Sequence, residues 1–173
     1  MLSGTHRNSL QEQVIYGRPA LEALTDLAKS FGAHRLMITS TASLAGPGGL
    51  AQRLAKDSGA ACVGIFARVS AHSPREGVIA GAAEARQLGA DLLVAVGGGS
   101  VIDATKVMQL ALWAGVESAE GLGAYRVGPG PDRADVSKLT PGVRMVAIPT
   151  TLSAAEFTAF AGGHRCLPPA KEG

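Results

Sequence analysis

The sequence predicts an α/β fold in which a parallel β-sheet carries helices on both faces. Short apolar runs alternate with longer amphipathic segments along most of the chain, which is the pattern of strand–helix–strand units. The run 91–96 is apolar at every position after its first residue, as in a central strand that helices cover on both sides. Proline at the start and glycine at the end of several predicted helices mark element boundaries.

The predicted elements follow one another as strand, helix, strand and helix. The run 13–17 is a short first strand or edge strand, and Pro19 opens a helix that Gly32 closes, with its apolar residues on one face. Further along we predict strand 35–39, polar loop 40–46, helix 47–58, strand 61–69, helix 74–88 ended by Gly89, strand 91–96, helix 100–114 and strand 144–148 ending at Pro149.

The segment 115–142 is predicted to be a long loop because it contains clusters of Gly, Pro and Asp. A connection of this length is either functional or mobile. The chain has 173 residues, which is enough for one sizeable domain. We assign residues 1–161 to that domain.

The charge balance excludes some classes of partner. The chain carries 16 basic and 14 acidic residues, a net charge of +2, so nothing favours nucleic acid or an anionic membrane as partner. The segment 1–13 is polar and lacks the apolar core of a signal peptide. No stretch approaches the about 20 apolar residues of a membrane span. We therefore expect a soluble cytoplasmic protein.

Cysteine and histidine usage gives no sign of a metal site. Cys62 lies in an apolar run, as a small core residue would, and Cys166 lies in a proline-rich tail. Neither belongs to a C-x-x-C pair, which fits a reducing compartment. The four histidines stand singly, without a histidine partner at helical spacing, and we expect surface or loop positions for them: His6, His34, His72 and His164.

The strongest candidate site is the glycine turn, Gly97-Gly98-Gly99-Ser100, between a predicted strand and a predicted helix. Glycines lack Cβ atoms and permit positive φ angles, so a phosphate can approach the backbone closely. The first N–H groups of the following helix have no partner within the helix, and the helix dipole adds favourable charge. The turn therefore predicts a pyrophosphate site.

A simpler interpretation of this segment stays open. Ser100 and Asp103 also fit the S-x-x-D capping pattern of a helix without a ligand, and Asp103 alone is most simply a cap. Lys106 either reaches a phosphate or the cleft, or pairs with Asp103 at i,i+3. The segment is no P-loop, and Ile102 occupies the third glycine position of the usual dinucleotide fingerprint.

The second candidate is the segment Ala147–Thr158, in which the last predicted strand ends at Pro149 and two threonines, Thr150 and Thr151, follow. Ligands of parallel sheets bind at the carboxyl ends of the strands, which directs attention to this segment and to the loops Ser40–Gly46, Ser70–Ser73 and 97–100. Threonine hydroxyls both donate and accept hydrogen bonds and suit a ribose or a nicotinamide amide. Alternatively, Thr151 or Ser153 is the N-cap of a following helix.

Together the two segments resemble the iron-containing alcohol dehydrogenase family. The segment 97–106 is similar to its GGGSxxDxxK signature, and 148–158 is similar to its next conserved block. The Thr-Leu-Ser-x-x-Glu-Phe-Thr form and the opening segment 16–20 are closest to the maleylacetate reductase branch of the family. A polyol or glycerol-phosphate dehydrogenase of the same superfamily shares the glycine turn, but the Leu-Ser-x-x-Glu-Phe-Thr segment favours the reductase branch. The resemblance covers Val14 to Ala161. It implies a Rossmann-like dinucleotide-binding domain that serves hydride transfer between NAD or NADP and a carbonyl, an alcohol or maleylacetate.

The resemblance also implies roles for individual residues. Positions matching Gly97, Gly98, Gly99 and Ser100 wrap the cofactor pyrophosphate, and the position matching Asp103 lies near the nicotinamide. Thr150, Thr151 and Leu152 match cofactor contacts. Ser40 and Thr41 lie where many relatives carry an acidic residue beside the adenosine ribose. A hydroxyl bonds a ribose without repelling a 2′-phosphate, so both NAD and NADP stay open.

Family members have a second, all-helical domain in which an Asp and three His hold a divalent metal, iron or zinc. The sequence shows no counterpart of that domain, and the tail 162–173 diverges from the family continuation, so we expect it to be disordered and the chain to be truncated or frameshifted. No catalytic residue and no metal ligand is then predicted here.

Two expectations follow from a missing helical domain. The first is that the chain is a non-catalytic dinucleotide-binding module, or an inert remnant that needs a partner chain; the small carbonyl or alcohol substrate would belong to full-length relatives. The second is self-association into a homo-oligomer or aggregate through the apolar surface that the lost domain would cover.

Overall fold

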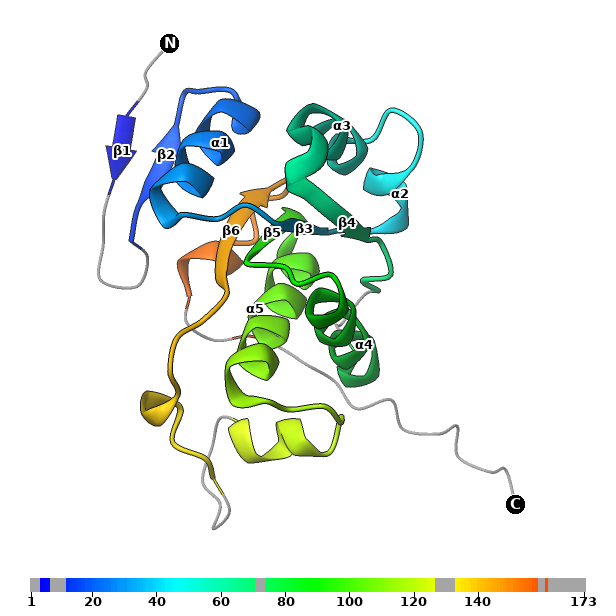
Figure 1. Cartoon of the computed structure of the whole chain (residues 1–173), viewed down its shortest axis with the longest axis vertical. Helices are drawn as coiled ribbons and strands as arrows, with labels where there is room; N and C mark the ends of the chain where they lie inside the picture. Colours follow the sequence, from blue (N-terminus) through cyan, green and yellow to red (C-terminus); the bar gives the residue numbers. More distant parts are fainter. Residues whose placement is uncertain (1–3, 7–11, 71–73, 127–132, 159–160, 162–173) are drawn as a thin grey trace.

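The central sheet has four parallel strands in the order β4-β3-β5-β6 (Figure 1). The computed structural model describes residues 4–6, 12–70, 74–126, 133–158 and 161. Strand bounds are β3 (Leu36–Thr39), β4 (Cys62–Phe66), β5 (Leu92–Gly97) and β6 (Arg144–Pro149). Gly97, the last residue of β5, lies opposite Pro149, the last residue of β6. The segments that follow these two strands therefore leave the sheet at the same edge.

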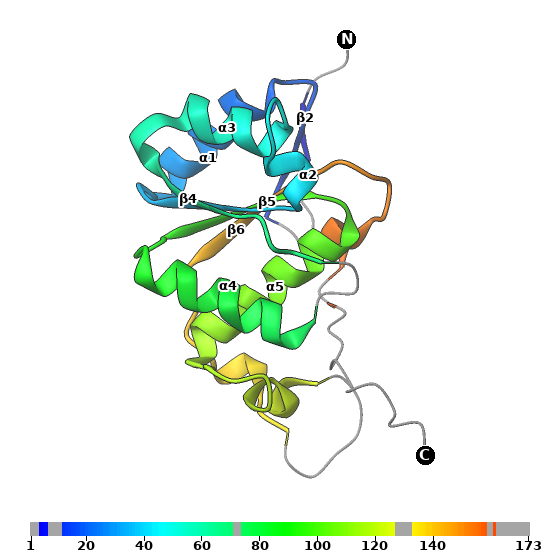
Figure 2. The same ribbon diagram turned by 90° about the vertical axis from the view of Figure 1, so that its right-hand side faces the viewer.

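Helices cover both faces of this sheet (Figure 2). One face carries α1 (Ala20–Phe31) and α3 (Leu50–Ser58), and the other carries α4 (Arg75–Gln87) and α5 (Gly99–Ala114). The predicted α/β fold with a parallel sheet is therefore confirmed, and its topology is that of a Rossmann-like domain.

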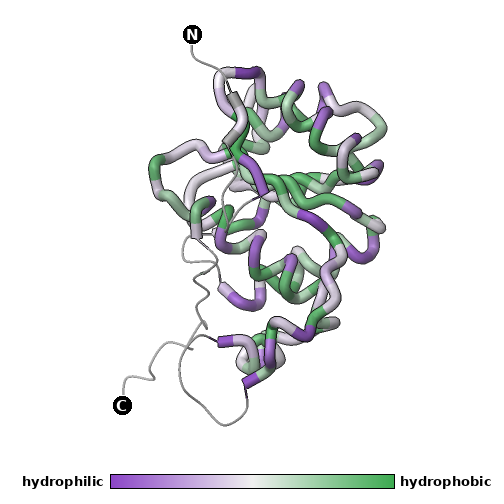
Figure 3. Tube along the Cα trace, turned by 90° about the vertical axis from the view of Figure 1, so that its left-hand side faces the viewer, coloured by the Kyte–Doolittle hydropathy of each residue, from purple (hydrophilic) through white to green (hydrophobic). Residues whose placement is uncertain are grey.

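Two hydrophobic cores, one on each face, account for the layers. Successive side chains of a strand point to opposite faces. Leu92, Val94 and Val96 pack with α1 and α3, whereas Leu93 and Ala95 pack with α4 and α5. Figure 3 shows the sheet as a hydrophobic band across the molecule, with hydrophilic residues on the outer helices. This two-sided burial is what the apolar run 91–96 predicted.

Two predicted helix ends are confirmed in their backbone geometry. Helix α1 begins directly after Pro19 and ends at Gly32, whose φ of 66° is left-handed. Helix α5 ends in the same way at Gly115, with φ 64°. Glycine adopts this conformation without the steric cost that other residues meet there, so these positions fix where each helix stops.

The predicted N-terminal strand forms, and it belongs to a sheet of its own. Strand β2 (Val14–Tyr16) pairs antiparallel with β1 (Gly4–His6) in a separate two-stranded sheet. It therefore does not extend the central sheet in the described part of the chain. Cys62, predicted in the core, is half-buried at the start of β4, and burial raises the pKa of its thiol.

Two predicted loops contain regular turns. The segment 40–46 includes the four-residue helix α2 (Ala42–Ala45). The segment 115–142 includes two 3-10 turns, η2 (Gly121–Tyr125) and η3 (Val136–Lys138), and Leu122 is buried in the core below α5. Part of this long connection is thus packed structure. A further 3-10 turn, η1 (Gly59–Ala61), leads into β4.

Some predictions fall outside the described residues. These concern the loop Ser70–Ser73 after its first residue, His72, His164, Cys166 and the tail 162–173. Among the helices that the structure describes, none has the length and apolarity needed to cross a membrane.

Candidate functional site

The loops at the carboxyl edge of the sheet are tied to one another by backbone hydrogen bonds. Ser40 donates its N–H to the Phe66 carbonyl at 2.9 Å and accepts from the Val69 N–H at 3.3 Å. Thr150 donates its N–H to the Gly97 carbonyl at 3.0 Å. The ladder of the sheet therefore continues into the segments that follow the strands, at the edge where ligands of such sheets bind.

The glycine turn is built by close packing. None of its three glycines has a positive φ, so the expected use of left-handed angles is wrong. Gly97 is buried, and a Cβ atom added there would lie 2.5 Å from Val101 Cγ2. Glycine is needed at this position because the first turn of α5 folds directly against it.

The two candidate segments meet at this turn. A Cβ atom added at Gly98 would lie 2.8 Å from Thr151 Oγ1, and one added at Gly99 would lie 3.0 Å from Ser153 Cβ. The threonine segment, residues 150–158, thus lies against the glycine turn although about 50 residues separate them along the chain. A side chain at position 98 would force Thr151 to shift, and one at position 99 would press against Ser153.

The start of α5 offers backbone N–H groups at the same place. The helix begins at Gly99 with Gly98 as its N-cap residue, which has no side chain to cap the helix. The predicted capping role of Ser100 and Asp103 is therefore wrong, because both residues lie inside the helix. The Val101 and Ile102 N–H groups turn back to the Gly98 carbonyl. The dipole of this 16-residue helix favours an anion at its N-terminus.

Ser40 and Thr41 are placed differently from one another. Ser40 is fully buried, and its hydroxyl donates to the Val96 carbonyl at 2.7 Å. This differs from the expected ribose contact, because the hydroxyl is used within the fold. Thr41 is half-buried, begins α2 as its N-cap residue and has its hydroxyl 3.0 Å from Ser43 Oγ. Of the two, Thr41 offers surface to a ligand.

Lys106 links the two segments in a way that the sequence did not predict. Its Nζ lies 3.5 Å from Asp103 Oδ1, which confirms the expected i,i+3 pair. The same Nζ donates to the Ala155 carbonyl at 2.5 Å and to Thr158 Oγ1 at 3.2 Å. The only signal for this in the sequence was the position of Lys106 inside the signature.

The threonine segment is largely exposed. Thr150, Thr151 and Leu152 are all exposed, and Leu152 is 107% exposed. The turn η4 (Ala155–Phe157) follows, with Ala154 as its N-cap in a left-handed conformation at φ 58°. A helix capped by Thr151 or Ser153, the alternative interpretation, is therefore not formed.

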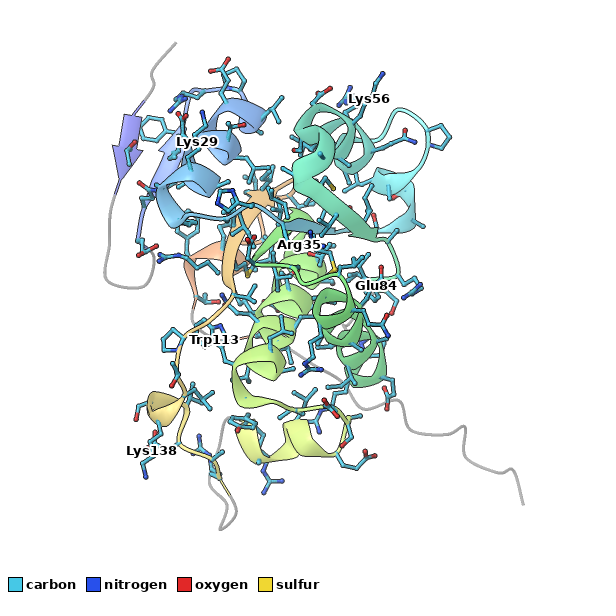
Figure 4. All side chains as sticks on the ribbon, in the orientation of Figure 1. Lys29, Arg35, Lys56, Glu84, Trp113 and Lys138 are labelled. Atoms are coloured by element: carbon cyan, nitrogen blue, oxygen red, sulfur yellow. The ribbon has the colours of Figure 1, made fainter. Side chains whose placement is uncertain are left out.

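An open cavity of about 1310 Å³ runs beside β6 and α5. Its lining includes Ile102, Trp113 and Phe157, and its charged lining is mostly basic, with arginines from several elements. Trp113 donates its indole N–H to the Val143 carbonyl at 2.9 Å and so fixes α5 to the approach of β6 (Figure 4). Among the described residues, no group of three or more His, Cys, Asp or Glu side chains could hold a metal ion.

A parallel sheet with helices on both faces, and a glycine turn that opens a helix at its carboxyl edge, define a Rossmann-like α/β domain. Residues 11–164 match the model of the family described as iron-containing alcohol dehydrogenase. The chain belongs to this family, which confirms the resemblance carried by the two segments.

Two curated relatives illustrate the match. The chain is 32% identical over 159 residues to Dehydrogenase FUM7 of Gibberella moniliformis, covering 90% of this chain and 37% of that protein. It is 38% identical over 103 residues to a maleylacetate reductase of Sphingobium indicum, covering 60% of this chain and 28% of that protein. The chain thus spans about a third of the length of these relatives.

A solved structure supports the fold. Sulfoacetaldehyde reductase from Bifidobacterium kashiwanohense, in complex with NAD+, is similar with a TM-score of 0.60 at 24% identity. The similarity covers 78% of this chain and 33% of that protein.

Proposed function

We propose that this chain binds NAD or NADP where the glycine turn meets the threonine segment, as the cofactor-binding part of an oxidoreductase. The reaction would be hydride transfer between the nicotinamide and a carbonyl or alcohol. The observation that carries the proposal is the contact of Thr151 and Ser153 with the positions of Gly98 and Gly99. It brings the two family segments together at the start of α5.

The residues present fit a dinucleotide. The backbone of Gly97, Gly98, Gly99 and Ser100 would receive the pyrophosphate, because a Cβ atom at the turn would fill the space beside Thr151. Thr150, Thr151 and Leu152 would contact the cofactor from the opposite side, and Asp103 would lie toward the nicotinamide. When bound, the nicotinamide supplies or accepts the hydride.

Thr41 and Ser40 would have different roles at the adenosine end of the cofactor. Thr41 would contact the ribose, and Ser40 would hold that loop through its bond to the Val96 carbonyl. Neither residue carries a negative charge, so the 2′-phosphate of NADP meets no repulsion from them. We therefore propose that the chain accepts both NAD and NADP.

The substrate and metal proposals rest on the relatives. One of the relatives is named maleylacetate reductase, and the mostly basic lining of the cavity beside β6 would suit an anionic substrate of this kind. Iron or zinc is proposed only for full-length members. A cytoplasmic location and self-association through exposed residues such as Leu152 and Phe157 stay predictions.

Calorimetric titration with NADH and NADPH tests the proposal. We expect binding by the unchanged chain, and an affinity weaker by roughly tenfold or more in Gly98→Ala, because the added methyl group would displace Thr151, a proposed cofactor contact, from the turn. Gly77→Ala, a glycine of α4 with nothing within 4 Å of an added Cβ, is the matched control.

The outcomes separate the alternatives. No binding by the unchanged chain, or equal affinity in Gly98→Ala, contradicts the proposed site. Binding without turnover of maleylacetate or simple aldehydes would identify a dinucleotide-binding module without catalysis of its own. Robust turnover would contradict the expectation that the chain is catalytically incomplete.

A further inference from the structure

We infer that Lys106 is a positioning residue that holds the threonine segment over the glycine turn. Its ammonium group lies 2.5 Å from the Ala155 carbonyl and 3.2 Å from Thr158 Oγ1. Its side chain is only 17% exposed, so this charge-assisted contact is largely shielded from water. The inference rests on the proposed function, because the held segment matters only where it meets a cofactor.

The Ala155 carbonyl is the point on which the segment is fixed. Besides Lys106 Nζ, it accepts the Thr158 N–H at 3.2 Å and the Thr158 hydroxyl at 3.2 Å. Asp103 Oδ1 lies 3.5 Å from the same ammonium group and restricts where the lysine can turn. Helix α5 therefore holds the segment through Lys106, about two turns after its own N-terminus.

The residue before this carbonyl is strained. Ala154 has φ 58° and is the one non-glycine residue with positive φ in the part of the chain that the structure describes. A residue with a Cβ atom keeps this conformation only where its surroundings enforce it. The bond from Lys106 to Ala155, directly after Ala154, supplies such a constraint.

The kink at Ala154 sets the path of the residues before it. Ser153 lies against Gly99, and Thr151 lies against Gly98. On the other side, the Thr150 N–H bonds to the Gly97 carbonyl. The exposed stretch between them is thus fixed at two ends, by the sheet at Thr150 and by Lys106 at Ala155. Without the second attachment, Ala154 would relax and the Thr151 and Ser153 hydroxyls would lose their place beside the turn.

Hydrogen exchange of the full chain measured by mass spectrometry tests the attachment without any ligand. Lys106→Met keeps the length of the side chain but removes the donor. We expect the Phe157 and Thr158 amides, bonded to the Ala154 and Ala155 carbonyls, to exchange roughly tenfold faster in this variant. The Thr150 amide, bonded to β5, should be unchanged and serves as an internal reference.

A matched control is available in another Asp–Lys pair at i,i+3. Lys138 Nζ lies 3.9 Å from Asp135 Oδ2 on η3, at the lower end of the view and away from the sheet (Figure 4). Lys138→Met should leave the exchange of the threonine segment unchanged. Thr158→Val removes one partner of Lys106 and should act in the same direction as Lys106→Met with a smaller effect, which keeps the test usable if Lys106→Met does not fold.

Titration with NADH tests whether the attachment of the threonine segment by Lys106 affects cofactor binding. We expect Lys106→Met to bind roughly tenfold more weakly, as for the loss of one charge-assisted hydrogen bond. Adding Ala154→Gly to Lys106→Met should restore part of the affinity, because glycine adopts the positive φ without help. A residue that merely stabilised the fold would not be rescued in this way.

Failure of the inference is distinct from failure of the proposed function. If the unchanged chain does not bind NADH, the proposed function fails, and exchange alone judges whether Lys106 holds the segment. Equal exchange in Lys106→Met and the unchanged chain overturns the inference. Weaker binding with unchanged exchange overturns it too, since Lys106 would then act on the phosphate directly. Faster exchange with unchanged affinity would show that the attachment does not position a cofactor contact.

Discussion

Strands β5 and β6 are parallel neighbours in register, yet they differ sharply in burial. All six residues of β5 are buried, whereas β6 is half-buried along its length and exposed at Pro149. Strand β5 lies between β3 and β6, while β6 ends the sheet within the described residues and lines the open cavity. Each strand leads into one of the two candidate segments.

The difference shows two ways of building one site. The glycine turn after β5 is positioned by hydrophobic packing, with Gly97 against Val101. The threonine segment after β6 is positioned by polar contacts, chiefly from Thr150 to Gly97 and from Lys106 to Ala155. We therefore expect changes in the first region to lower stability and changes in the second to alter binding with little effect on stability.

The largest loss of stability is expected for Gly97→Ala. The added Cβ atom would lie 2.5 Å from Val101 Cγ2 and 2.8 Å from Val101 Cβ, so the end of β5 or the first turn of α5 would have to move. Such overpacking lowers the free energy of unfolding by about 1–3 kcal/mol. Urea unfolding measures it, with Gly77→Ala as a control expected to be neutral or slightly stabilising. Equal urea midpoints for Gly97→Ala and the unchanged chain would contradict the claim that hydrophobic packing positions the glycine turn.

A smaller loss is expected for the buried hydroxyl pair below the turn. Thr39 and Thr105 are fully buried, with their hydroxyl oxygens 2.5 Å apart. Thr105→Val leaves Thr39 without this partner and should lower the free energy of unfolding by about 1–2 kcal/mol.

The double variant Thr39→Val/Thr105→Val sharpens this prediction. Removing both hydroxyls leaves no polar group from this pair in the core, so we expect a stability close to that of the unchanged chain. Thermal unfolding of the unchanged chain, the two single variants and the double variant gives the stabilities for a double-mutant cycle. Additive losses would show that the two hydroxyls do not stabilise one another.

The smallest effect on stability is expected for Leu152→Ser. Leu152 is fully exposed, so the free energy of unfolding should change by less than about 0.5 kcal/mol. If Leu152 covers part of the cofactor, affinity for NADH should fall roughly threefold to tenfold. Val136→Ser, an exposed apolar residue on η3, should change neither quantity. A large drop in unfolding temperature would contradict the polar positioning of this segment.

The sequence predicted the layers and several boundaries because these follow from local rules. The alternation of apolar runs located β3, β5 and β6, and proline and glycine located the ends of α1 at Pro19 and Gly32. The family signature located the two segments that meet at the site. Each of these signals depends on neighbours in sequence or on short spacings.

The remaining features depend on contacts between distant residues. The bond from Lys106 to Ala155 spans 49 positions, and the burial of Ser40 depends on the Val96 carbonyl of another strand. Helix α2 has four residues, too few for a helical period to be visible. Helix α5 begins at Gly99, so Ser100 lies inside the helix and not at its expected N-cap position.

The alternating burial of β5 has an evolutionary consequence. Inserting or deleting one residue between Leu92 and Val96 would rotate each following side chain to the opposite layer and displace the glycine turn by about 3.3 Å. The exposed stretch 135–138 around η3, in contrast, tolerates length changes at low conformational cost. Descendants of this gene should therefore vary in length there, and conserve the spacing from Leu92 to Gly97.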